Sequence, residues 1–293
     1  MEQTKLNYKV VGQGSPTIVF ESGLGGHYHD WHLVVDAIKS EATLVTYHRA
    51  GYADSISSNP WRTTNQIADE LKSMLEEIGV ENEIVLVGHS FGGLCVQHFV
   101  RLYPDKVKGV VLIDSTSANF SNLYSLDLPV LFSHITIEKL VENWRNLSKK
   151  TVNELRLSMK PLLSNEQLKL PKELHQAIEE FSTNPATYKT MASEIENWDC
   201  SSEQIKALAD FPDIPLYVIA RDSEVSVKFY TDRGIPEAEA VAYEDTWRKL
   251  QVEHSQLSKK GKVIVAEGSD HIIQLEKPKV IIDCIRELIK SMD

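Results

Sequence analysis

Short apolar runs alternate with segments of helical spacing along most of the chain. A run that is apolar throughout predicts a buried strand. Runs of this kind, several with one or two polar residues, occupy residues 6–11, 17–21, 42–47, 83–87, 109–113, 216–220 and 262–266. Between them, stretches such as residues 65–78 place apolar side chains three and four positions apart, which is typical of helices. Apolar strands that alternate with helices predict an α/β fold, with a mostly parallel sheet covered by helices on both faces.

This alternation stops after Asp114. Residues 116–212 contain no apolar strand run, and their apolar positions follow helical spacing divided by prolines. We therefore predict a helical insertion of residues 116–212 in a core formed by residues 1–115 and 213–293. The strand pattern then returns, followed by a helix with Trp247 on its apolar stripe and a last helix over residues 278–290.

One strand run leads directly into a candidate nucleophile. Residues 83–87 precede Gly88-His89-Ser90-Phe91-Gly92, and a helical pattern follows from near Leu94. A strand, a Gly-x-Ser-x-Gly motif and a helix are the sequence signature of a nucleophile elbow, in which the serine lies at the apex of a sharp turn. Gly88 and Gly92 provide the small residues that such a crowded turn requires.

A serine hydroxyl is a weak nucleophile at neutral pH, so it needs a base and two N–H donors for the oxyanion. His271 is the candidate base, because it follows a predicted strand and lies far downstream of Ser90. The backbone N–H groups of Phe91, directly after the serine, and of Leu24, in the glycine-rich loop 22–26, are the candidate oxyanion donors.

Together these stretches resemble the α/β-hydrolase superfamily. The resemblance rests on residues 21–26, 47–55, 88–93 and 268–271. It implies an eight-stranded, mostly parallel sheet, with the helical insertion between strands six and seven forming a cap over Ser90. Candidates to line the substrate cavity beneath the cap are Trp144, Trp198, Phe132 and Tyr188.

The resemblance leaves three candidates for the triad acid. In this superfamily the acid follows strand seven or, in some members, strand six. Asp114 ends the predicted strand six, whereas Asp222 and Glu224 follow strand seven. We favour Asp114, with Glu224 and Asp222 as alternatives, because the loop that holds these two lacks the usual glycine. The acid would orient the imidazole of His271 and stabilise its protonated form.

The remaining features narrow the range of partners. The spacing of His27, His29, Asp30 and His32 fits no metal site that we can defend, and we assign no metal and no cofactor. A net charge of −11 argues against nucleic-acid and anionic-membrane partners. No signal peptide or membrane span is recognisable, which predicts a cytoplasmic protein, whereas the oligomeric state stays open.

The sequence thus predicts a serine hydrolase that cleaves an ester-type bond of a small, partly apolar substrate by acyl-enzyme chemistry. Dehalogenases and epoxide hydrolases of this superfamily use an aspartate nucleophile, so Ser90 argues against both. Peptidase, carbon–carbon hydrolase and perhydrolase activities stay open. The alternative is a ligand-binding or signalling protein of the same fold, with slow or no turnover.

Overall fold

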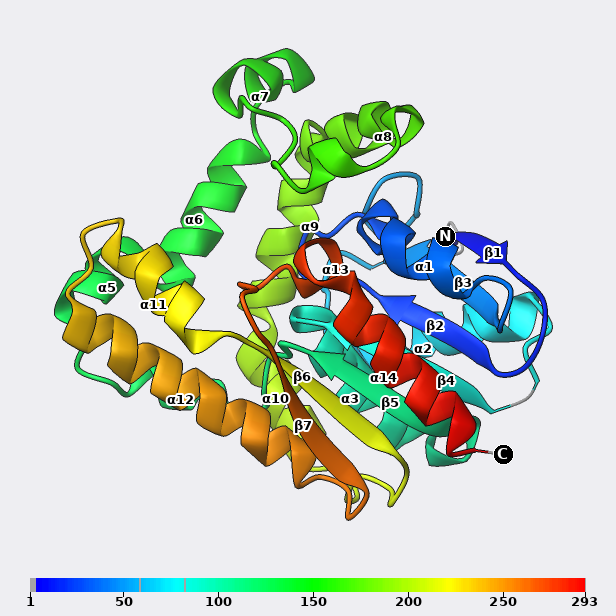
Figure 1. Ribbon diagram of the computed structural model, residues 1–293. Coiled ribbons are helices and arrows are strands. Elements are labelled where there is room, and N and C mark those ends of the chain that lie inside the picture. Colours follow the sequence, from blue (N-terminus) through cyan, green and yellow to red (C-terminus); the bar gives the residue numbers. More distant parts are fainter. Residues whose placement is uncertain (1–3, 58, 82, 293) are drawn as a thin grey trace.

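A computed structural model describes residues 4–57, 59–81 and 83–292. Within these residues, seven strands form one sheet in the order β1-β3-β2-β4-β5-β6-β7 (Figure 1). β1 runs antiparallel to β3, and the other neighbouring strands are parallel. The strands are β1 (Asn7–Val11), β2 (Thr17–Glu21), β3 (Thr43–His48), β4 (Ile84–His89), β5 (Val107–Ile113), β6 (Leu216–Arg221) and β7 (Gly261–Ala266).

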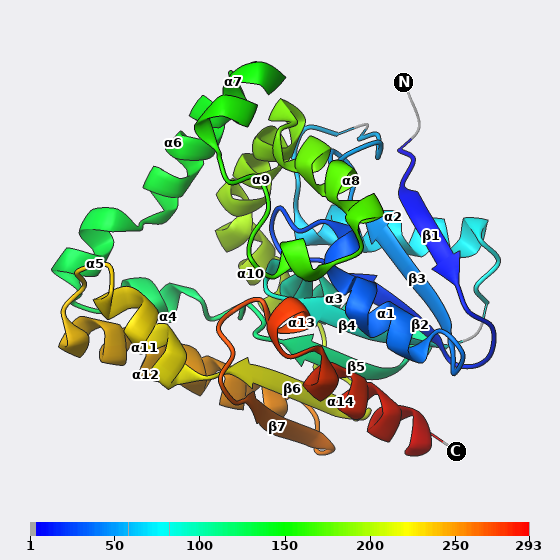
Figure 2. The ribbon, with the colours of Figure 1, turned by 45° about the horizontal axis from the view of Figure 1, so that its top comes forward.

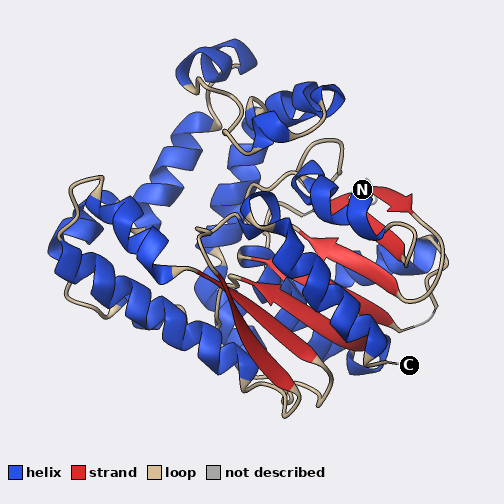
Figure 3. Ribbon diagram, viewed as in Figure 1, coloured by secondary structure: helices blue, strands red, loops and turns tan. Residues whose placement is uncertain are grey.

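Helices cover both faces of the sheet, as the sequence pattern predicts (Figure 3). The central strand β4 shows the reason, because successive side chains of a strand point to opposite faces. Ile84 and Leu86 join the apolar cluster beneath α2 and α3, whereas Val85 and Val87 join the cluster beneath α1 and α14. The helices of the core are α1 (His32–Ile38), α2 (Thr64–Glu77), α3 (Phe91–Leu102), α11 (Ser223–Thr231), α12 (Glu237–Ser255), α13 (Ile273–Glu276) and α14 (Pro278–Lys290).

Residues 116–212, all of which the structure describes, form helices and no strand. In Figure 1, α6, α7 and α8 lie above the sheet, and Figure 2 shows the same helices from a second direction. α9 packs along α6, and α10 reaches α2 and α3 of the core. The helices of this segment are α4 (Ser121–Tyr124), α5 (Pro129–His134), α6 (Ile137–Leu147), α7 (Val152–Ser158), α8 (Lys172–Ser182), α9 (Pro185–Glu196) and α10 (Trp198–Lys206).

Several details differ from the expectations. The sheet has seven strands in the described residues, not eight, and the helical segment lies between the fifth and the sixth. The eighth strand came from the family resemblance, and the sequence holds no further apolar run to form it. α3 begins at Phe91 rather than near Leu94. α11 was not expected, because its mixed polar sequence reads as a loop; Asp222 caps its first turn.

Across the part of the chain that the structure describes, no helix has both the length and the apolar character needed to cross a bilayer. The predicted absence of a signal peptide rests partly on residues 1–3, which lie outside the described residues.

Candidate active site

Ser90 lies at the turn between β4 and α3. Its backbone has φ 52° and ψ −124°, a left-handed conformation that non-glycine residues rarely adopt. The flanking glycines permit the turn, because their neighbours leave no room for side chains. A Cβ at Gly88 would lie 2.8 Å from Gly93 Cα, and one at Gly92 would lie 2.4 Å from the carbonyl oxygen of Glu21. Ser90 is thus the residue that immediately precedes the first turn of α3.

The structure brings Ser90, His271 and Asp114 into one hydrogen-bonded chain. His271 Nδ1 lies 2.6 Å from Asp114 Oδ2, and His271 Nε2 lies 3.0 Å from Ser90 Oγ. Because a carboxylate only accepts hydrogen bonds, Nδ1 carries the proton and donates it to Asp114. Nε2 of the neutral ring is then free to accept the hydrogen bond of the Ser90 hydroxyl.

Asp114 is completely buried and follows β5, with a positive φ of 39°. Its Oδ1 accepts from Trp247 Nε1 at 2.7 Å, and its Oδ2 accepts from Arg221 Nη1 at 3.1 Å. Burial by itself raises the pKa of Asp114, but the Arg221 cation and the hydrogen bonds from His271 and Trp247 outweigh it. Together they hold the pKa well below its usual range, so this carboxylate stays ionised.

Arg221 is itself held in place by a second carboxylate. Its Nε and Nη2 donate to the two oxygens of Glu244 on α12, at 3.0 and 2.5 Å. The guanidinium also lies over the ring of Trp247, 4.6 Å from its centroid. Asp114 is therefore oriented by two residues that α12 carries or anchors.

The ring of His89 supports the backbone of His271. Its Nε2–H donates to the carbonyl oxygen of His271 at 2.9 Å, and its Nδ1 lies 3.3 Å from Gln274 Nε2. Burial lowers the pKa of His89 to about 3. His89 is therefore neutral at physiological pH and keeps one donor and one acceptor.

The two alternative acids lie away from the imidazole. Asp222 accepts from the backbone N–H of Gly268 at 2.8 Å and of Glu224 at 3.0 Å, so it caps α11 and holds the loop that leads to His271. Glu224 is exposed on α11. The described hydrogen bonds and ion pairs of His271 include neither carboxylate.

The two candidate oxyanion donors flank the serine. Phe91 is the first residue of α3, where backbone N–H groups have no partner within the helix. Gly23, which precedes Leu24, lies so close to the elbow that its Cβ would be 3.2 Å from Ser90 Cβ. Neither the Phe91 nor the Leu24 N–H has an acceptor among the loop and turn hydrogen bonds described.

The four aromatic residues predicted to line a cavity separate into three groups. Trp144 and the buried Trp198 belong to the apolar cluster that includes Phe91 and Leu24. Phe132 packs instead with α11 and α12. Tyr188 donates its hydroxyl hydrogen bond to the carbonyl oxygen of Ser182 within the helical segment.

The histidine cluster after the glycine-rich loop is a local cap. His27 Nδ1 accepts from the backbone N–H of His29, and Asp30 accepts from the backbone N–H of His27. Among the described residues, no group of three or more His, Cys, Asp or Glu side chains is arranged to hold a metal ion.

Sequence reasoning missed the residues that surround Asp114. Trp247 was identified only as part of an apolar stripe, and it is indeed buried, but its N–H also binds Asp114. No role was predicted for Arg221 and Glu244, because the sequence does not indicate which charged residues will be buried. The one available signal was the position of Arg221 at the end of a fully apolar strand.

Comparisons with known proteins agree with this fold. Residues 16–278 match the sequence profile of the alpha/beta hydrolase fold. The chain belongs to the α/β-hydrolase fold family. A stretch of 145 residues, half of the chain, is 28% identical to the uncharacterised protein YqjL of Bacillus subtilis (strain 168). This match spans 57% of the length of that relative.

Solved structures share the fold of this α/β-hydrolase. A thermophilic esterase from Thermogutta terrifontis superposes with a TM-score of 0.64 at 19% identity, over 98% of this chain and 94% of the esterase. The epoxide hydrolase VrEH1 from Vigna radiata superposes with a TM-score of 0.69 at 18% identity, over 98% of this chain and 95% of the other. Both likenesses concern the fold.

Proposed function

We propose that this protein is a serine hydrolase that cleaves an ester-type bond in a small, partly apolar substrate. The observation that carries the proposal is the continuous hydrogen-bond chain from Ser90 Oγ through His271 to the buried Asp114, with contacts of 3.0 and 2.6 Å. A nucleophile, a base and an ionised group that orients the base have this geometry in hydrolases that form acyl-enzymes.

In the proposed reaction, Ser90 Oγ attacks the substrate carbonyl carbon while its proton passes to His271 Nε2. The N–H groups of Leu24 and Phe91 stabilise the oxyanion of the tetrahedral intermediate. Collapse of the intermediate breaks the ester bond, and the leaving alcohol takes the proton from Nε2. Water then attacks the acyl group on Ser90, with the same nitrogen as base, and releases the acid. No step requires a metal or a cofactor.

We further propose that residues 116–212 form a cap on a core of residues 1–115 and 213–293. Trp144 on α6 and Trp198 on α10 share an apolar cluster with Leu24 and Phe91, the residues of the proposed oxyanion donors. Apolar side chains of the cap therefore lie next to the reacting groups, which suits a substrate with an apolar acyl or alcohol part. An aspartate-dependent reaction such as epoxide opening does not suit Ser90.

The test uses p-nitrophenyl acetate, butyrate and octanoate together with a fluorophosphonate probe. We expect release of p-nitrophenol by the wild type, loss of at least about 10³-fold in Ser90→Ala, and probe attachment at Ser90 by mass spectrometry. Full turnover by Ser90→Ala would overturn the mechanism. Probe attachment without turnover of any ester would favour the ligand-binding alternative, and no attachment would refute an activated serine.

A further inference from the structure

A second buried arginine lies on the other side of the serine. Arg49 directly follows β3, and only 3% of its surface is exposed. Its Nη1 donates to Glu21 Oε1 at 2.7 Å and to the carbonyl oxygen of Ser22 at 2.5 Å. Its Nη2 donates to the carbonyl oxygen of Gly23 at 3.0 Å. The guanidinium therefore donates hydrogen bonds to two successive carbonyl groups of the loop that carries Leu24.

The Gly23 carbonyl belongs to the same peptide unit as the Leu24 N–H. This peptide bond is trans, because the only cis bonds among the described residues precede Pro16 and Pro161. In a planar trans peptide the C=O and the N–H point in opposite directions. Arg49, by holding the Gly23 oxygen, directs the Leu24 N–H away from itself. Gly23 lies against the nucleophile, since its Cβ would be 3.2 Å from Ser90 Cβ.

The next peptide of the loop is held from the helical segment. Tyr52 Oη accepts from the backbone N–H of Gly25 at 3.3 Å and donates to Glu194 Oε2 at 2.6 Å. Glu194 lies on α9 and is completely buried. Met191 of the same helix closes over the loop, because a Cβ at Gly25 would lie 2.7 Å from its sulfur. Both peptides that flank the Leu24 residue are thus fixed.

Glu194 also completes the surroundings of Arg49. Its Oε1 accepts from Arg49 Nε at 2.7 Å, and its Oε2 accepts from Nη2 at 3.0 Å. With these contacts, every N–H group of the guanidinium faces an acceptor within hydrogen-bond distance. Such a fork is rigid, because a planar cation bound on several sides has one orientation. The orientation of the loop therefore depends on α9, whose Glu194 lies 145 residues from Arg49 in the sequence.

We propose that Arg49 is a positioning residue for the oxyanion site and that Glu194 makes this positioning depend on the docking of α9. Arg49 orients the Gly23–Leu24 peptide, and Glu194 holds Arg49 in that orientation. Neither side chain contacts the substrate in this account. The inference rests on the proposed function, in which the Leu24 N–H stabilises the oxyanion.

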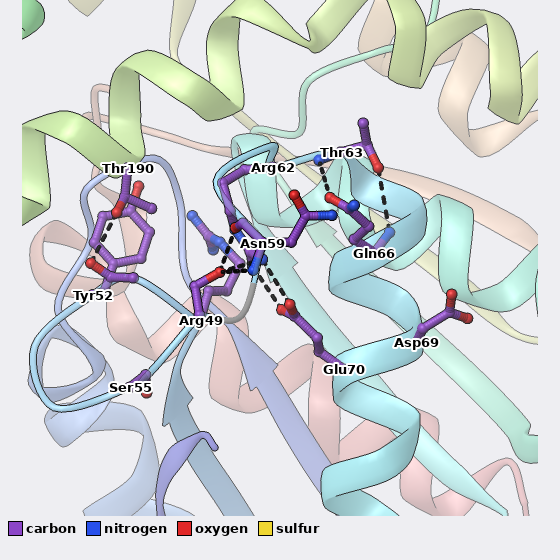
Figure 4. A network of polar contacts seen from close by, with 12 residues as sticks. Arg49, Tyr52, Ser55, Asn59, Arg62, Thr63, Gln66, Asp69, Glu70 and Thr190 are labelled. Atoms are coloured by element: carbon purple, nitrogen blue, oxygen red, sulfur yellow. Dashed lines mark hydrogen bonds and ion pairs between the residues drawn. The ribbon is translucent and has the colours of Figure 1, made fainter. Parts of the chain in front are cut away.

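The chain offers a matched control beside this network. Arg62 is also buried, and its two terminal nitrogens donate to the two oxygens of Glu70, both at 2.6 Å (Figure 4). Figure 4 shows Arg49 and Arg62 as neighbours below the helix that carries Thr190. The hydrogen bonds described for Arg62 include none with residues 22–26. Loss of the Arg62–Glu70 ion pair therefore reports the structural cost alone.

The experiment compares Glu194→Gln with Glu70→Gln, and adds Tyr52→Phe as a milder change that removes a hydroxyl without removing a charge. For each variant, kcat and KM for p-nitrophenyl butyrate, the thermal unfolding midpoint, and hydrogen–deuterium exchange of peptides covering residues 20–30 are measured. Because removal of one oxyanion donor costs about 10²–10³ in kcat, we expect misorientation in Glu194→Gln to lower kcat by about 10- to 100-fold. KM should change less than about threefold, and exchange in residues 20–30 should be faster.

Glu70→Gln should lose a similar part of its thermal stability and keep kcat within about threefold. Tyr52→Phe should lower kcat by less than Glu194→Gln does, and the loss of its hydrogen bond to the buried Glu194 should also lower its unfolding midpoint. Equal kcat and equal loop exchange in Glu194→Gln and Glu70→Gln would overturn the inference. If the wild type proved inactive, the proposed function and the oxyanion role would both fall. Faster hydrogen–deuterium exchange of residues 20–30 in Glu194→Gln, but not in Glu70→Gln, would then still show that Glu194 anchors the loop. Failure of the proposed function and failure of the anchoring role are thereby distinguished.

Discussion

Asn in place of Asp114 is the substitution that most directly distinguishes the three candidate acids. Asp114 receives hydrogen bonds from Trp247 Nε1 and Arg221 N at one oxygen, and from Arg221 Nη1 and His271 Nδ1 at the other. If the amide oxygen of the new Asn keeps the first pair, its NH₂ group faces His271. The imidazole can then bind it only by accepting at Nδ1, which leaves the proton on Nε2.

An imidazole with its proton on Nε2 cannot take the proton of Ser90. Because a wrong tautomer of this kind costs about 10⁴-fold in a serine protease, we expect Asp114→Asn to lower kcat for p-nitrophenyl butyrate by about 10³- to 10⁴-fold. That loss corresponds to about 4–5.5 kcal/mol of transition-state stabilisation. KM should stay nearly constant, since no substrate contact is removed.

The same substitution also has a cost in stability. Loss of one partner from a buried ion pair typically costs about 3–5 kcal/mol. Arg221 keeps both of its bonds to Glu244, however, so its charge is not left unpaired. We therefore expect a loss of about 2–3 kcal/mol, somewhat less than the usual range. Urea unfolding followed by circular dichroism measures this quantity and verifies that the variant is folded in the activity assay.

The controls are Asp222→Asn and Glu224→Gln. Because Asp222 accepts from the Gly268 N–H, we expect Asp222→Asn to lower kcat, but by less than about tenfold. Glu224 is exposed, so Glu224→Gln should change kcat by less than about threefold. A folded Asp114→Asn that keeps more than a tenth of wild-type kcat would refute this assignment of the acid. A thousandfold loss of kcat in Asp222→Asn alone would instead identify Asp222, which follows β6, as the triad acid.

Three further outcomes follow from other contacts. Trp247→Phe removes the indole N–H that binds Asp114, so we expect a loss of about 1.5–3 kcal/mol in urea unfolding and lower kcat at constant KM; unchanged values for both would contradict a hydrogen-bonded role. Gly92→Ala places a Cβ 2.4 Å from the Glu21 carbonyl oxygen, so we expect a thermal midpoint lower by several degrees, and a wild-type midpoint would show that α3 shifts freely. Burial lowers the pKa of six histidines below that of the unfolded chain, so protonation favours unfolding. Stability that is complete above about pH 6.5 should therefore be lost as the pH falls toward 4, by up to about 8 kcal/mol per pH unit. Urea unfolding at pH 7, 6 and 5 measures this slope, and equal stability at the three values would exclude it. The pKa values are about 2 for His27, about 3 for His48 and His89, and about 4 for His29, His98 and His254.

The central part of the fold could be predicted because local chemistry determines it. Apolar runs of the right length predicted all the strands of the sheet, and the glycines around Ser90 predicted the turn. The start of α3 was placed too late, because Gly92 and Gly93 read as helix breakers. In the structure both glycines lie inside the helix, where Glu21, Ser22 and Ser115 crowd them. Glycine is required at these two positions because of close packing, which cannot be read from the sequence.

The contacts around the proposed acid could not be predicted for a different reason. Asp114, Arg221, Glu244 and Trp247 come from three separate segments, and each depends on the others for a satisfied position in the interior. A buried charge is tolerated only when its partners arrive with it. The sequence therefore showed three plausible carboxylates, and only the fold brings one of them next to His271.

Arg221 and Arg49 use one physical arrangement on opposite sides of Ser90. Arg221 binds Asp114 and is held by Glu244 of α12, and Arg49 binds the Gly23 carbonyl and is held by Glu194 of α9. In each case a rigid cation fixes the position of a group next to the nucleophile relative to a helix that is distant in the sequence. Because each cation has all its acceptors only when its helix is docked, an error in the packing of α9 or α12 leaves buried guanidinium N–H groups without acceptors, which is costly. The precision of the site is thereby tied to the correct docking of α9 and α12, two helices that carry neither the nucleophile nor the base.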